Sequence, residues 1–319
     1  IQSSCRPLIP EHDRLTSSLG HPTSMNLAKL TKRRRWLIAT GIALLCGLGI
    51  SALVGSALTA AKPAQVGSLP ETYGSEDVLI ESESGSTLGA WYIDTPGAVA
   101  TIVLLHPLDG HRRAMLKRLD LMTAAGYSVL SIDFQACGMS PGESITMGYL
   151  ESLDTEAAVA YARIRQPTHK IGIIGWSLGG AATLLAKDLQ ADAVVLECVY
   201  PTIQQGIHNR VDHFIGPLAH VVTPLLTLQL PLRLGITTSD LRPIDYIADL
   251  GCPVLILGGA DDPFTPASET RDLFEAAKEP KHLSLFEGSA HTDLMRDDGA
   301  KYADEVVGFL AEYLPQSKP

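Results

Sequence analysis

The chain carries little positive charge, few aromatic residues and no recognisable cofactor motif. Lys and Arg number 25 against 35 Asp and Glu, and the resulting net charge of −10 argues against nucleic acid as a partner. No G-x-G-x-x-G follows a strand-like run, no Walker motif occurs, and no His or Cys cluster has the spacing of a metal site. We therefore expect no cofactor and no metal ion.

Cysteine is also sparse, and its spacing argues against a disulfide framework. The five cysteines are Cys5, Cys46, Cys137, Cys198 and Cys252, with no C-x-x-C pair among them. Cys198 ends one predicted strand and Cys252 begins the next, so in a parallel sheet they lie at opposite edges, too far apart to bridge. We expect Cys137, Cys198 and Cys252 to be small buried apolar residues.

The N-terminal region does not have the pattern of a folded unit. Residues 1–35 mix Pro, Ser, His and charge without periodicity, which predicts a disordered leader ending in a basic cluster at 32–35. Met25 is a natural start for the protein, in which case residues 1–24 are an extension; the alternative is that they are native sequence.

An uncharged apolar stretch follows at residues 36–61 and predicts a transmembrane anchor. Its 26 residues exceed the ~20 that a helix needs to span a bilayer and the ~7–15 of a signal-peptide core. The preceding basic cluster keeps the N-terminus in the cytoplasm and places the main domain outside it. The alternative is a cleaved signal peptide, because small residues at 55–61 could form a cleavage site, and the product would then be secreted or periplasmic.

The rest of the chain has the pattern of one α/β domain. Residues 62–75 contain several Pro and Gly and predict a linker, and residues 76–319 form the domain. After an initial hairpin, strand-like runs alternate with helical patterns, which indicates a doubly wound, mostly parallel sheet with helices on both faces. The predicted strands are 77–81, 87–94, 100–106, 127–133, 171–174, 193–198, 254–258 and 282–286, and the predicted helices are 111–125, 149–165, 178–190, 268–278 and 301–314.

One long insert, residues 201–249, interrupts this alternation where an α/β loop usually takes ~2–6 residues. Its pattern is helical, with prolines as breaks and an apolar run at 221–232. We predict a small helical cap over the carboxyl edge of the sheet, where open α/β sheets bind ligands. The alternative is a structural excursion that touches no substrate. Its histidines, His208, His213 and His220, match no common metal spacing.

The segment Gly175-Trp-Ser177-Leu-Gly179 is a G-x-S-x-G pattern between an apolar strand and an apolar helix. Such a pattern predicts a nucleophile elbow, a sharp turn that exposes one hydroxyl above the sheet. Small residues are needed there because Cβ atoms would collide with the neighbouring strand and helix. The alternative role for Ser177 is that of a helix N-cap.

A serine hydroxyl needs a base, and the base needs an acid to orient it. Candidates follow Ser177 in the order Ser, Asp, His, each after a predicted strand. Asp261 and Asp262 follow the strand 254–258, and His291 follows the strand 282–286. All three strand ends lie at the same edge of a parallel sheet, so these side chains can converge.

These pieces together resemble the α/β-hydrolase fold family, in particular its small bacterial serine hydrolases and esterases. The resemblance covers residues 76–319 and rests on His106-Pro-Leu, on Asp133 to Ser140, on the elbow, and on the Asp261-Asp262 and His291 turns. It implies an eight-stranded, mostly parallel sheet, Ser177 as nucleophile, and His291 as base. In the family's pattern the catalytic Asp stands three residues after a strand-ending Gly and four before a Pro, which selects Asp262, with Asp261 as runner-up.

The resemblance also implies an oxyanion hole built from two backbone amides. One is Leu178, directly after the nucleophile. The second comes from the loop after His106, where the family usually has Gly but this chain has Pro107, which lacks an N–H. We therefore assign Leu108, and we expect the nearby Asp109 to point its side chain away. Asp133, Gln135 and His106 are expected to brace these loops.

The predicted function is hydrolysis of carboxylic esters through an acyl-enzyme, on a small-molecule substrate with an apolar group. Two alternatives remain: cleavage of amides or peptides on the same fold, or a non-catalytic binding module tethered to a membrane. A dehalogenase is disfavoured because the elbow carries Ser rather than Asp.

Overall fold

The computed structural model describes residues 32–187 and 189–314, so residues 1–31 of the leader predicted at 1–35 lie outside the described residues. Its basic end, residues 32–35, is not disordered as predicted but forms the first turn of a helix. The chain divides into two units, residues 1–47 and 48–319. A long helix, α1 (Lys32–Thr59), begins in the first unit and ends in the second. Its segment Arg34–Thr59 is long and apolar enough to cross a membrane, close to the predicted 36–61.

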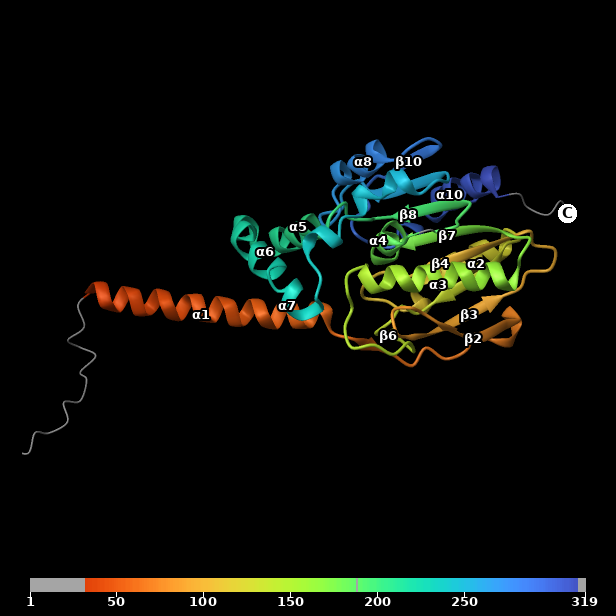
Figure 1. Ribbon diagram of the computed structural model, residues 1–319. Coiled ribbons are helices and arrows are strands. Elements are labelled where there is room, and N and C mark those ends of the chain that lie inside the picture. Colours follow the sequence, from red (N-terminus) through yellow and green to blue (C-terminus); the bar gives the residue numbers. More distant parts are fainter. Residues whose placement is uncertain (1–31, 188, 315–319) are drawn as a thin grey trace, which may run out of the picture. The chain divides into compact units, whose positions relative to one another are not determined.

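The second unit is built on an eight-stranded sheet in the order β10-β9-β8-β7-β4-β5-β3-β2 (Figure 1). All neighbours pair in parallel except β2 with β3 and β3 with β5, which are antiparallel. The fold class predicted from the strand and helix alternation is confirmed. The strands are β2 (Ser75–Glu81), β3 (Thr87–Ile93), β4 (Ala100–Leu105), β5 (Ser128–Ile132), β7 (Lys170–Trp176), β8 (Ala193–Glu197), β9 (Val254–Gly259) and β10 (Lys281–Phe286).

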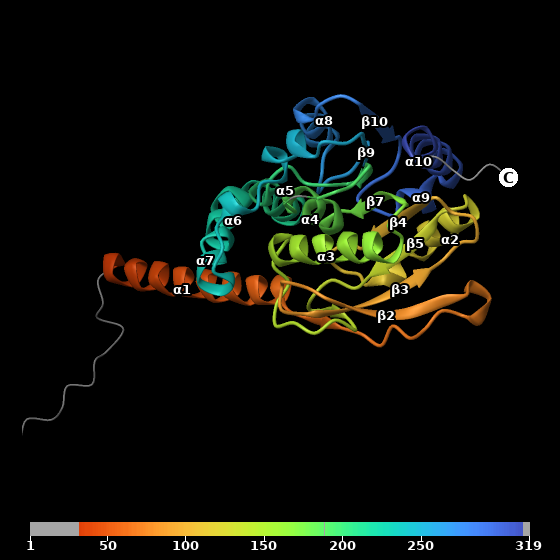
Figure 2. The same cartoon turned by 45° about the vertical axis from the view of Figure 1, so that its right-hand side comes forward.

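Helices cover both faces of this sheet because its central strands are apolar on both sides (Figure 2). One buried cluster packs α3, α4 and α8 against one face, and a second packs α2 and α10 against the other. The helices are α2 (Leu116–Ala124), α3 (Tyr149–Arg165), α4 (Leu178–Leu185), α8 (Ala267–Ala276), α9 (Leu294–Asp297) and α10 (Gly299–Tyr313).

The helix after the elbow is shorter than the predicted 178–190. The last intrahelical bond of α4 runs from the Ala186 amide to the Ala182 carbonyl. The next amide, that of Lys187, donates instead to the Glu156 carboxylate on α3. The Glu156 side chain therefore accepts the backbone amide at the point where the pattern predicted another turn of helix.

The segment predicted as a linker, residues 62–75, packs on the domain. Its first residues form β1 (Lys62–Pro63), which pairs in parallel with β6 (Cys137–Gly138). Val66 and Leu69 are buried, and the Trp91 indole donates to the Gly67 carbonyl. The Val66 carbonyl likewise accepts from the Arg113 guanidinium, so bonds to the body of the domain hold this segment in place.

The insert 201–249 is helical, as its pattern predicts, and its three helices gather beyond one end of the sheet (Figures 1 and 2). They are α5 (Ile203–Ile215), α6 (Ala219–Thr227) and α7 (Leu230–Leu234), followed by three short 3-10 turns. We call α5 to α7 the cap.

Candidate active site

Ser177 lies at the turn between β7 and α4. Its φ of 51° falls in the left-handed region, which a residue with a Cβ adopts only under strain. The turn is tight: a Cβ at Gly175 would lie 2.7 Å from the Gly179 backbone, and one at Gly179 would lie 2.3 Å from the Leu105 carbonyl oxygen. The two glycines of the pattern are therefore required by close backbone contacts.

His291, from the loop after β10, reaches the elbow across 114 positions of sequence. Its Nε2 lies 3.4 Å from the Ser177 Oγ, and its Nδ1 lies 2.7 Å from the Asp262 Oδ2. The structure thus brings together Ser177, His291 and, of the two candidate carboxylates, the one that the family resemblance had selected. Because Nδ1 donates to the carboxylate, Nε2 is left as the acceptor facing the serine.

Asp262 is buried, whereas Asp261 is exposed. Besides His291, the Asp262 carboxylate accepts bonds from the Phe264 amide, at 2.8 Å, and from the amide and hydroxyl of Thr265, at 3.0 and 2.6 Å. Burial alone would raise the pKa of Asp262, but the bonds from His291 and Thr265 outweigh it and lower that pKa. The carboxylate therefore stays ionised beside the imidazole.

The loop after β4 carries the residues expected to complete the oxyanion hole. The Pro107 carbonyl accepts from the Gly110 amide at 3.0 Å, which closes a turn with Leu108 and Asp109 at its centre. The Leu108 side chain packs on the core, and the Asp109 carboxylate is exposed and paired with Lys62. Asp109 thus has a cationic partner at the surface, in line with the expectation that it points away.

His106 braces this loop and is buried completely. Its Nδ1 lies 2.8 Å from the Pro107 carbonyl, and its Nε2 accepts from the Phe134 amide at 3.0 Å. Desolvation lowers the pKa of His106 to about 4, so the ring is neutral at physiological pH. This pair of bonds ties the loop after β4 to the turn after β5.

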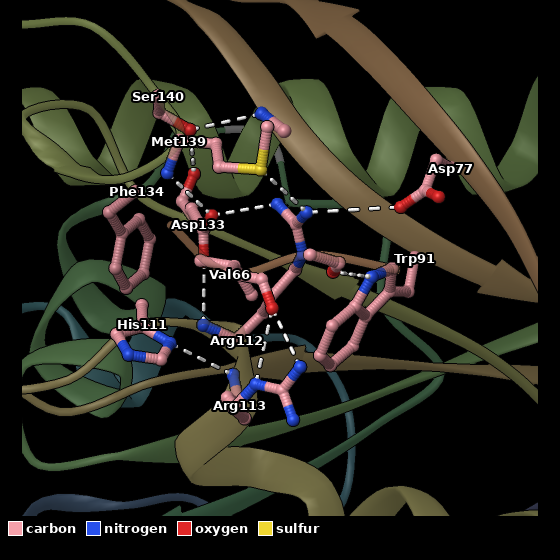
Figure 3. A network of polar contacts seen from close by, with 12 residues as sticks. Val66, Asp77, Trp91, His111, Arg112, Arg113, Asp133, Phe134, Met139 and Ser140 are labelled. Carbon is pink, nitrogen blue, oxygen red and sulfur yellow. Dashed lines mark hydrogen bonds and ion pairs between the residues drawn. The ribbon is translucent and has the colours of Figure 1, made fainter. Parts of the chain in front are cut away.

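Asp133 and Arg112 form the centre of that second turn (Figure 3). The Asp133 carboxylate accepts from the backbone and guanidinium of Arg112, at 2.6 and 2.7 Å, and from the Met139 amide at 2.9 Å. Gln135 donates to the buried Glu151 at 2.7 Å. These residues bond to loops and helices rather than to Ser177, which agrees with the bracing role expected for Asp133 and Gln135.

A second buried ionic network lies close to Ser177, His291 and Asp262, which we call the triad, and was not anticipated from the sequence. Arg118 on α2 pairs with Glu197 at the end of β8 and, at 3.0 Å, with Asp293 in the His291 loop. Its guanidinium also stacks on the Trp176 ring at 4.7 Å. The network thus contacts both the elbow and the histidine loop. Its signal in the sequence was a charge, Glu197, at the end of a fully buried strand.

Cys198 lies close to the triad, a placement that sequence reasoning also missed. Its Sγ, a carboxylate oxygen of Asp262 and a ring nitrogen of His291 all lie within 4.8 Å of one another. Burial, with the nearby Asp262, raises the pKa of the Cys198 thiol well above its ordinary value. Since metals bind the thiolate and Asp262 is already saturated with hydrogen bonds, this group is poorly suited to a metal ion.

The cap meets the triad through Phe264. The Phe264 ring lies 5.5 Å from the His291 ring, 5.3 Å from His213 and 6.4 Å from Phe214, both of which lie on α5. A cavity of about 460 Å³ lies between α5 and α6, lined in part by His208 and His220, but none of its lining residues belongs to the triad. The aromatic contacts, rather than this cavity, connect the cap to the chemistry.

The chain resembles known proteins over most of its length. A model of the dienelactone hydrolase family matches residues 95–307, more than half of the chain. Among relatives, YqkD of Bacillus subtilis is 26% identical over 241 residues, covering 73% of this chain and 78% of YqkD. The α/β hydrolase domain-containing protein WAV2 of Arabidopsis thaliana is 26% identical over 264 residues, covering 76% and 80%.

Solved structures share the fold at low sequence identity. The Pyrococcus furiosus esterase Pf2001 superposes with a TM-score of 0.67 at 21% identity, over 80% of this chain and 98% of the esterase. XC6422 of Xanthomonas campestris, described as a serine hydrolase without a lid, has a TM-score of 0.54 at 16% identity, over 76% and 97%. On the family match and the shared fold, this chain belongs to the dienelactone hydrolase family within the α/β-hydrolase superfamily.

Proposed function

We propose that the protein is a serine hydrolase that cleaves carboxylic esters through an acyl-enzyme. The observation that carries this proposal is the alignment of Ser177, His291 and Asp262, with Oγ to Nε2 at 3.4 Å and Nδ1 to Oδ2 at 2.7 Å. A distance of 3.4 Å is long for a hydrogen bond, but catalytic contacts commonly tighten when substrate binds.

The reaction takes two steps. Ser177 Oγ attacks the ester carbonyl carbon while His291 Nε2 takes the hydroxyl proton, and the same proton then goes to the departing alcohol as its C–O bond breaks. Water attacks the resulting acyl-serine, gives one proton to His291, and releases the carboxylic acid as Ser177 regains its proton. The anionic Asp262 holds the imidazole in its Nδ1–H form and stabilises the imidazolium.

The backbone amides of Leu178 and Leu108 form the oxyanion hole in this mechanism. Leu178 is the first residue of α4, so its amide lies at the positive end of that helix. Leu108 follows Pro107 in the turn fixed by His106. Aromatic side chains beside His291 favour a substrate with an apolar acyl or alcohol group.

We further propose that residues 36–61 form an uncleaved anchor, with the hydrolase domain of residues 76–319 outside the cytoplasm. Contacts within the second unit favour retention. Gln229 donates to the Ser51 hydroxyl at 2.7 Å, and Arg233 donates to the Ala52 carbonyl and the Ser56 hydroxyl, each at 2.6 Å. Cleavage within residues 55–61 would remove these partners and leave Gln229 bonded to the Leu225 carbonyl and Arg233 bonded to Gln229.

A fluorophosphonate probe tests the nucleophile. The full-length protein in detergent is expected to give a covalent adduct on Ser177 at neutral pH, and Ser177→Ala is expected to give none while losing hydrolysis of a soluble short-chain ester. No adduct on the wild-type protein would overturn the proposal. Faster hydrolysis of peptide amides than of esters would assign the triad to the other bond type.

The acid is tested by a matched pair of neighbouring residues. Asp262→Asn is expected to lower kcat by roughly 10⁴-fold, because the amide favours the wrong imidazole tautomer and carries no charge. Asp261→Asn, one residue away and exposed, is expected to stay within about two-fold of wild type, as surface changes usually do. The reverse order of effects would reassign the acid.

A further inference from the structure

The cap exposes large apolar side chains to an unusual degree. Of the twelve large hydrophobic residues that are exposed within residues 60–187 and 189–314, six lie in the cap and the others are scattered. We call these six the cap face: Phe214, Ile215, Leu218, Val221, Leu228 and Leu232. On α5, a helix of 13 residues, only Ile203 is buried. The cap buries Leu226 and Leu230 but leaves the six side chains of the cap face exposed to the outside.

The cap is also free of charge where it is most apolar. Residues 213–232 contain no Asp, Glu, Lys or Arg, although the whole chain is 19% charged and has a net charge of −10. The nearest charged residues in sequence, Asp212 and Arg233, flank this stretch, so charge is confined to its two ends. An uncharged apolar run whose helices are each too short to span a bilayer fits a segment at the membrane interface.

The last turns of α1 lie against the cap and are themselves apolar. Gln229 and Arg233, at the start and end of α7, bond to Ser51, Ala52 and Ser56 of that helix. Around these polar contacts, Leu48 is 52% exposed and Leu53 is 72% exposed, while Leu232 on α7 is 88% exposed. The outward apolar surface of the cap thus continues onto the end of the helix proposed as the anchor.

We propose that the cap face lies in the surface of the same bilayer that holds α1, and that the triad receives ester substrates dissolved in that bilayer. The cap face and the triad are joined by aromatic contacts: Phe214 meets Phe264, which meets His291. An amphiphilic ester would then reach Ser177 beside the Phe264 ring, over which the Arg210 guanidinium lies at 4.6 Å. This inference rests on the proposed hydrolase function and gives it a substrate class: esters with acyl chains long enough to partition into membranes.

Fluorescence tests the placement without requiring activity. Full-length Leu232→Trp and Leu79→Trp proteins are reconstituted in phosphatidylcholine vesicles with and without bromine on the acyl chains. Leu79, 73% exposed on the edge strand β2, is the matched control, and Trp36, Trp91 and Trp176 are common to both proteins. We expect the added tryptophan at 232 to be quenched and that at 79 not to be. No difference between the two would overturn the proposal.

Kinetics test the substrate class. Leu218→Ser with Leu232→Ser is expected to lower kcat/KM on a long-chain ester in vesicles by about ten-fold or more, since burying each leucine contributes enough to change partitioning by that factor. Hydrolysis of a soluble short-chain ester by this double variant is expected to stay unchanged. The control double variant, Leu79→Ser with Ile164→Ser, is expected to hydrolyse both esters as wild type does.

Failure of the hydrolase proposal is distinguishable from failure of this one. A wild-type protein inactive on both esters contradicts the hydrolase, and the quenching result still decides where the cap face lies. Equal loss on both esters, or a cap-face variant that changes only the oligomeric state in detergent, would assign these side chains to folding or to self-association and overturn the bilayer contact.

Discussion

Two histidines at this site differ in burial and in the charge of their partners. His291 has a carboxylate partner, and 13% of its side chain is exposed. His106 is fully buried, and both of its ring nitrogens bond to backbone groups. Since Nε2 of His106 accepts the Phe134 amide, a proton added there would break that bond as well as place a charge in the core. His106 can therefore make both of these bonds only while its ring is neutral.

The lowered pKa of His106 predicts how the stability of the protein depends on pH. With a pKa of 6.5 when unfolded and about 4 when folded, the unfolded state binds the proton more readily between these values, so stability falls as pH drops from 6.5 towards 4. His106→Gln lacks this titration. Between pH 7 and 4.5, wild type is expected to lose roughly 2–3 kcal/mol more unfolding free energy than the variant, measured by urea unfolding in detergent.

Asp154 makes this comparison with the variant necessary. Burial raises its pKa to about 6, so Asp154 gains protons on folding and stability falls as pH rises from about 4 to 6, opposite to the effect of His106. Wild type alone would show the sum of the two, whereas the difference from His106→Gln removes the Asp154 contribution. Equal pH slopes for wild type and variant would contradict a neutral, buried His106.

At the scale of elements, β4, β7 and α4 are held together by backbone contact at the elbow. Gly179→Ala would place a Cβ 2.3 Å from the Leu105 carbonyl at the end of β4. Because the backbone on both sides must then move, we expect a loss of ~1–3 kcal/mol in stability. The loop of Leu108 follows β4 directly, so the shift would also misplace the proposed oxyanion hole, at an expected cost of roughly 100-fold in kcat.

The matched control is Gly308→Ala on α10. That glycine is exposed in a helix interior, with nothing within 4 Å of an added Cβ. Alanine there is expected to raise stability by up to ~1 kcal/mol through helix propensity and to leave kcat unchanged. Thermal unfolding and ester kinetics on both variants check this; a Gly179→Ala protein as active and stable as wild type would contradict the tight elbow.

Element types were predicted better than element ends and packing. All eight strands of the main sheet were expected within a few residues, because apolar runs between turn signals are a local property. The end of α4 was not, because Glu156 on another helix accepts the next amide. The docking of residues 62–75 was missed for the same reason: its acceptors meet donors such as Trp91 only in the folded chain.

For the whole molecule, the apolar N-terminal helix gives a prediction on processing. If residues 36–61 are an anchor, the protein isolated from cells is expected to keep them and to remain in the membrane pellet after alkaline carbonate extraction. N-terminal sequencing checks this, and a mature N-terminus beyond residue 61 would contradict it. The structural reason for retention is that Ser51 and Ser56 are partners of the cap side chains Gln229 and Arg233.

The sequence by itself determined the fold class, the tight G-x-S-x-G turn, and the order of Ser177, the Asp261-Asp262 pair and His291, because strand periodicity, glycine at a tight turn and the shared edge of parallel strands are all properties of the chain. The choice of Asp262 came from the resemblance to α/β-hydrolases. Only the tertiary structure decided which other side chains surround these three residues and how the cap is placed. The Arg118–Glu197–Asp293 network and the place of Cys198 join segments far apart in sequence. The exposure of the cap face likewise depends on which sides of the cap helices pack against the core, and residue spacing alone does not determine that.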